Sequence, residues 1–95
     1  MAISEATRSR YIQNLQAQVQ MLRNAMEKSD FEEVRAICHR VQGSAGLFGM
    51  KDLGEACRAM EEAAIANLPT QVVEAFQVIE VILARKVEGP IDAQV

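Results

Sequence analysis

The chain has little of what most other fold classes require. Its 95 residues include no tryptophan, only two prolines, five glycines and 4% aromatic residues. So few turn-forming residues leave little room for the many tight turns of an all-β domain. The hydrophobic fraction of 49%, against 24% charged residues, is enough for one buried core. The composition therefore predicts a single helical domain.

Several functional classes are also disfavoured by what is missing. No apolar run approaches the roughly 18 residues of a membrane-spanning helix, and MAISEATRSR at the start lacks an apolar signal segment. The net charge of −3, with dispersed basic residues, gives no electrostatic footprint for nucleic acid. We therefore expect a cytoplasmic protein with no membrane or nucleic-acid partner.

Cysteine is scarce as well. Cys38 and Cys57 are the only two, and neither belongs to a CxxC pair. Reduced thiols are expected instead of a disulfide, and one histidine with two distant cysteines is a poor set of metal ligands. No metal or other cofactor is expected in the chain itself.

Apolar residues recur at helical spacing in four segments, with short connections between them. The predicted helices cover about 4–28, 30–49, 50–66 and 69–88. Ser4 and Asp30 are plausible N-caps, and the fourth helix is expected to stop before Gly89-Pro90. Short connections force neighbouring helices to run antiparallel. The predicted fold is all-α, an antiparallel up-down-up-down four-helix bundle with a longer N-terminal first helix. It forms a single domain over 1–95, with a core at about 4–88 and a loose tail at 89–95.

The second predicted helix carries the most regular apolar stripe and the only histidine. The stripe, spaced 3, 4, 3 and 4, consists of Phe31, Val34, Cys38, Val41 and Ala45. At about 100° per residue, His39 falls more than about 100° from the centre of this stripe and so points away from the core. The residues near His39 on this outward side are Arg35, Ala36, Gln42, Gly43 and, one turn further, Gly46.

Glycine inside a helix costs roughly 1 kcal/mol relative to alanine. Because Gly43 and Gly46 are expected inside the helix and on the side of His39, we interpret them as a clearing that lets a large partner reach the imidazole. The alternative is that the helix ends near Gly43. His39 would then be an ordinary surface residue near a helix C-terminus.

The chemistry that suits an exposed histidine is limited by its neighbours. Positions three and four residues away from His39 hold no acid, which disfavours general-base catalysis. A neutral imidazole is itself a nucleophile, and Gln42 and Arg35 are candidate donors to the oxygens of a phosphoryl group. The metal and carboxylates that stabilise a transferring phosphoryl group are missing, so a partner has to supply them.

The segment HRVQGSAGLFG, residues 39–49, resembles the signature of histidine-containing phosphotransfer (HPt) domains. The third predicted helix resembles the family pattern at Leu53, Glu55, Ala56, Cys57, Met60 and Glu61. The resemblance implies a four-helix bundle in which His39 accepts a phosphoryl group from a receiver aspartyl phosphate and passes it to another receiver. Gly43 then gives access, and Gly46 matches a small-residue position.

The resemblance also implies a phosphocarrier without autonomous catalytic activity. Its partners are response-regulator receiver domains, which bring Mg²⁺, and a hybrid histidine kinase is a further candidate. One position departs from the family, because Gln42 stands where lysine is usual. Arg35 or Arg40 is hypothesised to compensate for the missing charge.

Two other functional classes stay open. One is a degenerate HPt-like adaptor that binds a receiver or kinase without phosphoryl turnover, and the other is a purely structural or dimerisation domain. A monomer is expected. Val78 and Val81 lie off the main stripe of the fourth predicted helix and are assigned to a wide buried face, with a dimer contact as the alternative.

Overall fold

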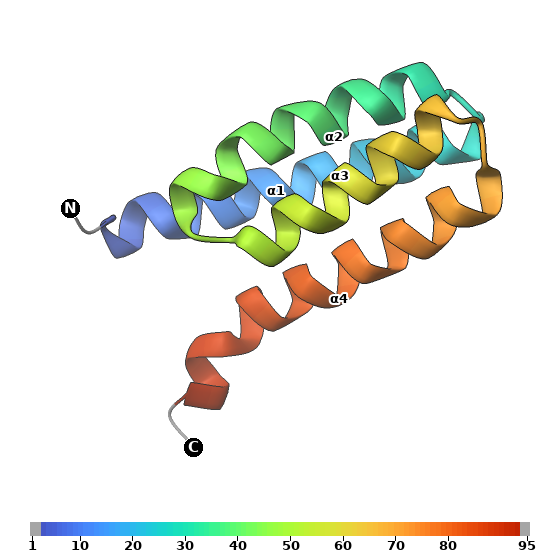
Figure 1. The fold of residues 1–95 in the computed structure, drawn as a ribbon. Coiled ribbons are helices and arrows are strands. Elements are labelled where there is room, and N and C mark those ends of the chain that lie inside the picture. The colour runs from blue at the N-terminus through green and yellow to red at the C-terminus, as the bar shows by residue number, and fades with distance from the viewer. Residues whose placement is uncertain (1–2, 94–95) are drawn as a thin grey trace.

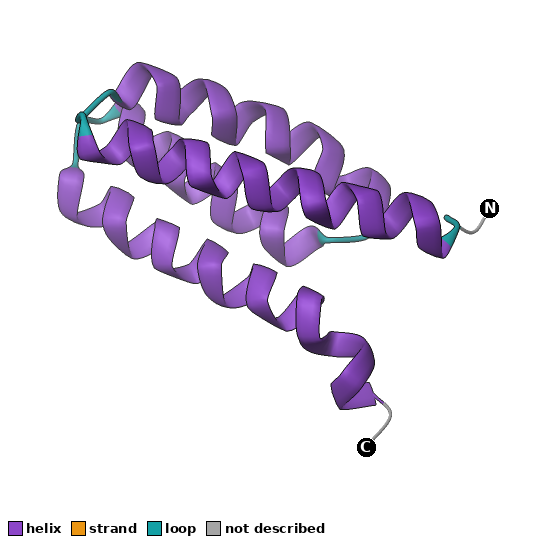
Figure 2. Cartoon of the chain, turned by 180° about the vertical axis from the view of Figure 1, so that it is seen from behind, coloured by secondary structure: helices purple, strands orange, loops and turns teal. Residues whose placement is uncertain are grey.

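The computed structural model describes the backbone of residues 3–93 and the side chains of residues 3–87. Its elements are α1 (Glu5–Glu27), α2 (Phe31–Ala45), the short 3₁₀ turn η1 (Gly46–Phe48), α3 (Lys51–Ile65) and α4 (Pro69–Ala93). Figures 1 and 2, from opposite sides, show the four helices alongside one another and joined at alternating ends. The predicted four-helix bundle is confirmed. At 23 residues, α1 is longer than α2 and α3, which have 15 each.

Local signals in the sequence set the helix ends. The Ser4 side chain accepts a hydrogen bond from the Thr7 backbone N–H at 3.1 Å, and Asp30 Oδ1 accepts one from the Glu33 N–H at 3.2 Å. Both satisfy donors that would otherwise be unpaired in a first helical turn. Gly49, which follows η1, has a φ of +69°, a left-handed conformation that glycine adopts without strain.

The core is the shared interior of the four apolar stripes. Met26 of α1 and Phe31 of α2 are partly buried and pack against it. The apolar residues at helical spacing in α3 and α4 are buried, namely Leu53, Cys57, Met60, Ala64, Val72, Phe76, Ile79 and Leu83. The contact between α2 and α3 is the most extensive of the bundle. The buried residues of α2 are Val34, Ile37, Cys38, Val41 and Ala45. This packing fixes how the two helices sit against each other. No helix in the described part of the chain is long and apolar enough to cross a membrane.

The end of α4 differs from the prediction. The helix runs to Ala93 and passes through Gly89-Pro90, where the sequence predicts its stop. Proline removes one backbone hydrogen bond and kinks a helix without necessarily ending it, and Figure 1 shows α4 bending near its C-terminal end. Residues 89–93 of the predicted loose tail are therefore helical, whereas residues 94–95 lie outside the described residues.

The assignment of Val78 and Val81 to a wide buried face is also wrong. Their exposed fractions are 51% and 50%. The reason is that α4 packs on α3 and α1 along one side only, with Val72, Phe76 and Ile79 turned inward. The other side of the helix faces solvent.

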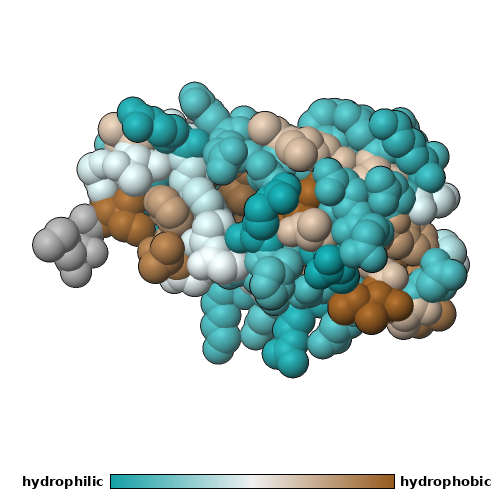
Figure 3. Space-filling model, turned by 90° about the horizontal axis from the view of Figure 1, so that it is seen from above, coloured by the Kyte–Doolittle hydropathy of each residue, from teal (hydrophilic) through white to brown (hydrophobic). Residues whose placement is uncertain are grey.

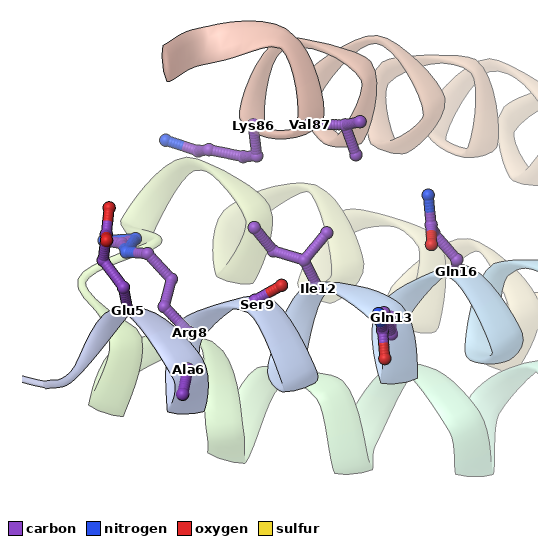
Figure 4. Close-up of a pocket in the computed structure, with 9 residues that line it drawn as sticks. All are labelled: Glu5, Ala6, Arg8, Ser9, Ile12, Gln13, Gln16, Lys86 and Val87. Carbon is purple, nitrogen blue, oxygen red and sulfur yellow. The ribbon is translucent and has the colours of Figure 1, made fainter.

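A groove of about 580 Å³ separates the first turns of α1 from the later part of α4. Figure 4 shows Ile12 of α1 below Lys86 and Val87 of α4, which line the opposite wall. None of the residues that line it belongs to α2 or α3. The groove is therefore separate from the surface that carries His39.

The burial pattern predicts a difference between two isoleucines. Ile37 of α2 is fully buried, whereas Ile65, the last residue of α3, is 65% exposed. Ile37→Ala should lower the free energy of unfolding by about 2–5 kcal/mol, because it removes buried methyl groups and leaves a cavity. Ile65→Ala, the matched control, should change it by less than about 0.5 kcal/mol. Urea unfolding followed by circular dichroism measures both, and equal effects would contradict the described core.

Candidate functional site

His39 lies on the outer side of α2, as its position in the sequence predicts. Its side chain is 73% exposed, while the preceding Cys38 is completely buried. The imidazole is not isolated, because its Nδ1 atom lies 3.2 Å from Oε2 of Glu61, which comes from α3. A carboxylate therefore contacts the ring from the neighbouring helix.

Glu61 connects two side chains of α2. Its Oε2 faces the His39 ring, and its Oε1 accepts a hydrogen bond from Nε2 of Gln42 at 2.5 Å. The Glu61 side chain is only 15% exposed, so these contacts take place in a largely desolvated position. We call His39, Gln42 and Glu61 the histidine cluster.

The role of Glu61 in this cluster is not predicted from the sequence, because helical spacing identifies only neighbours of His39 on its own helix. Glu61 follows the buried Met60 and so lies beside the apolar stripe of α3, at the border between core and solvent. That position was a usable signal, because a carboxylate at the edge of a helix–helix contact is placed to meet a polar residue across it.

The partner near Nδ1 favours one state of the ring. A carboxylate oxygen only accepts hydrogen bonds, so the approach of Oε2 to within 3.2 Å of Nδ1 favours the tautomer of His39 that carries its proton on Nδ1. The other ring nitrogen, Nε2, then holds the free lone pair. An exposed imidazole oriented in this way by a carboxylate is a prepared nucleophile.

Gly43 and Gly46 have no side chains, so nothing projects from the surface at these two positions near His39. A Cβ atom added to Gly43 or to Gly46 would meet no other atom within 4 Å, so packing within the chain does not require glycine at either position. Because α2 continues to Ala45, the alternative that the helix ends near Gly43 is wrong. Gly46 lies at the junction of α2 and η1, not inside the helix as predicted.

The arginines do not join the histidine cluster in this conformation. Arg35 donates from Nε and Nη2 to Oε1 of Glu32, at 3.1 and 2.8 Å. Arg40 is exposed and lines a cleft between α1 and α2 together with Tyr11 and Ser44. Ala36 is half-buried. Of the predicted donors to a phosphoryl group, the structure brings only Gln42 next to His39.

The turn after the site is held against α1. The ring of Phe48 stacks on Tyr11 with centroids 3.8 Å apart, and the Tyr11 hydroxyl lies 2.6 Å from Oγ of Ser44. Burial raises the pKa of the Tyr11 phenol, which outweighs the opposite effect of the Ser44 hydrogen bond. Between these anchors Leu47 is 76% exposed. The end of α2 therefore presents one apolar side chain on a fixed turn.

The two cysteines are free and buried, as the prediction of reduced thiols requires. A hydrogen bond with Cys57, together with burial, raises the pKa of the Cys38 thiol. The protonated thiol is a poor nucleophile, so Cys38 contributes to the α2–α3 contact and not to the chemistry of the exposed face.

Figure 3 views the bundle from above, where α2 lies uppermost in Figure 1. Hydrophilic side chains cover most of this face, and hydrophobic ones appear as separate patches among them. This side of the bundle is therefore mainly polar.

The comparisons with known proteins gave one result. The family model described as Hpt domain matches residues 7–87, a range that contains the whole histidine cluster and parts of all four helices. Neither the curated proteins nor the solved structures gave a match to this chain.

The glycine geometry predicts a gain in stability from a substitution beside His39. Gly43 is helical and has free space for a Cβ, so Gly43→Ala should raise the free energy of unfolding by about 0.4–1 kcal/mol. Gly49→Ala, the control, should lower it, because the φ of +69° at Gly49 is unfavourable for alanine. Thermal and urea unfolding test both. A loss of stability for Gly43→Ala would show that this glycine is needed for packing after all.

Proposed function

Because this chain belongs to the Hpt domain family, we propose that His39 accepts a phosphoryl group from the aspartyl phosphate of a response-regulator receiver domain and passes it to another receiver. Hpt domains are phosphocarrier modules that act in the histidine phosphotransfer of two-component signalling. The observation that carries the proposal is the exposed imidazole whose Nδ1 lies 3.2 Å from a carboxylate oxygen of Glu61. A cytoplasmic monomer that has no nucleic-acid or membrane partner is part of the same proposal.

The proposed step follows from the orientation of the ring. The lone pair of His39 Nε2 attacks phosphorus, the N–P bond forms, and the P–O bond to the receiver aspartate breaks with its electron pair leaving on the carboxylate. The ring keeps its Nδ1 proton and becomes positively charged, and the Glu61 carboxylate 3.2 Å away stabilises that charge. Attack by the aspartate carboxylate of a second receiver reverses the step.

The chain is proposed to need no cofactor of its own. Phosphoryl transfer is normally assisted by a divalent cation held by carboxylates, and the receiver is expected to supply its Mg²⁺ and acidic residues. The division of labour is then simple. This chain supplies the nucleophile and its orientation, and the partner supplies the charge stabilisation on the phosphoryl oxygens.

Access supports a protein partner. A specific protein interface covers about 800 Å² on each side, so a receiver that reaches Nε2 also covers the surface around Gly43 and Gly46. Leu47, 76% exposed directly after Gly46, is an apolar side chain within reach of such an interface. A low surface beside a fixed apolar anchor suits docking of a globular domain.

Gln42 favours a second candidate function. Its amide contacts Glu61 and carries no positive charge toward an incoming phosphate, unlike a lysine at the same position. The alternative is an adaptor that binds a receiver or a hybrid histidine kinase without phosphoryl turnover. The two functions differ in whether phosphate appears on His39.

We expect phosphate transfer to His39 from at least one member of a panel of receiver domains phosphorylated with acetyl phosphate. The label should be acid-labile and base-stable, and mass spectrometry should place it on His39. His39→Gln should abolish it, because an amide is not a nucleophile here, while Gln77→Ala, a control at an exposed position of α4, should retain it. A complex without label supports the adaptor, and label on His39→Gln contradicts the proposed acceptor.

A bulky side chain at Gly43 should prevent a receiver from docking beside His39 without unfolding the bundle. Gly43→Leu places a bulky side chain in open solvent beside His39, so the bundle should stay folded while phosphoryl transfer slows by about a hundredfold. Ala17→Leu, at an exposed position of α1, is the matched control and should transfer at the normal rate. Stopped reactions with a phosphorylated receiver give the rates. An unchanged rate for Gly43→Leu would exclude docking over this surface.

A further inference from the structure

We propose that Gln42 is a positioning residue for His39. Its amide holds the Glu61 carboxylate in the orientation that fixes the His39 ring as the Nδ1–H tautomer. The part of this inference that concerns transfer rate rests on the proposed function. The part that concerns the ring applies to the free protein.

The geometry carries the argument. His39 and Gln42 are three residues apart on α2, and Glu61 reaches between them from α3. Each carboxylate oxygen has its own partner, Oε1 with Gln42 Nε2 at 2.5 Å and Oε2 with His39 Nδ1 at 3.2 Å. A glutamate side chain has several rotatable bonds, and a contact at only one oxygen leaves the carboxylate free to turn. With Oε1 held by Gln42, Oε2 stays directed at the ring.

The amide also preserves the charge of Glu61. Among the ion pairs of the described residues, Glu61 pairs with His39 alone, whereas Arg35 is engaged by Glu32 and Arg58 by Glu62. A lysine at position 42 would hold the carboxylate and partly neutralise it. Gln42 holds it with a neutral donor, so the full negative charge stays available to the imidazole.

A direct role of Gln42 on the phosphoryl group fits the contacts less well. The amide nitrogen is directed at Glu61, which sits beside Nδ1, whereas the phosphoryl group joins the other ring nitrogen, Nε2. Gln42 therefore affects the reacting nitrogen indirectly. It orients Glu61, Glu61 favours the proton on Nδ1, and the lone pair is then on Nε2.

The test begins with the free protein. Ring ¹⁵N chemical shifts of His39, recorded at alkaline pH where the imidazole is neutral, report which nitrogen carries the proton. Wild type should be mainly the Nδ1–H tautomer. Gln42→Met, which keeps the length of the side chain and removes its donor, should shift the population toward Nε2–H. Gln42→Lys restores a donor and should return the population to Nδ1–H. Gln77→Ala, at an exposed position of α4, should have no effect.

The second measurement is a double-mutant cycle on the transfer rate. Gln42→Met should slow transfer by about tenfold, the effect of one lost hydrogen bond to a charged group. In a Glu61→Gln background the same substitution should add nothing, because the carboxylate it positions is already gone. The same loss in both backgrounds would mean that Gln42 contacts the phosphoryl group directly, and would overturn the inference.

The two proposals fail separately. A wild-type protein that takes no phosphate from any receiver contradicts the proposed function, while the ring ¹⁵N shifts still decide the role of Gln42. Conversely, a wild-type tautomer that Gln42→Met leaves unchanged overturns the positioning role, whatever the transfer rate.

Discussion

The apolar contact between α2 and α3 is the constraint on which the histidine cluster depends. Val34, Ile37, Cys38 and Val41 of α2 are buried, as are Leu53, Cys57 and Met60 of α3, and Cys38 contacts Cys57 between the two helices. Close packing permits few alternative registers, since one methyl group out of place costs stability. Cys38 directly precedes His39, and Met60 directly precedes Glu61. The register in which the buried residues of α2 pack against those of α3 therefore also sets the distance between the His39 imidazole and the Glu61 carboxylate.

Much of this arrangement was predictable from the sequence, and the remainder was not for identifiable reasons. Helical periodicity gives the buried stripes and the outward direction of His39, since both depend on one helix at a time. The contact between His39 and Glu61 depends on how α2 and α3 are aligned along each other. The spacing of apolar residues within one helix gives no information about that alignment. The end of α4 was mispredicted because proline weakens a helix without always ending it. Val78 was misplaced because the width of a buried face depends on how many neighbours a helix has.

The charge balance around the imidazole works in two directions. A carboxylate at Nδ1 favours the positive ring that forms when Nε2 is substituted, but it repels the negative charge of a phosphoryl group. Gln42 adds no cation that would offset the repulsion, and Arg35 is occupied by Glu32. The cluster therefore combines stabilisation of a positively charged ring with repulsion of an anionic group.

All three members of the histidine cluster lie on α2 and α3. These two helices are consecutive in the chain and are connected by η1 and its flanking residues. The helices α1 and α4 provide no member of the cluster. They contribute apolar stripes that close the core, and α1 also contributes Tyr11, which stacks on Phe48 of η1 just after α2. The site is therefore a property of one helical hairpin. Sequence drift in α1 and α4 is tolerable wherever their inward stripes are kept, and grafting α2 and α3 onto another pair of supporting helices would carry the whole cluster with them.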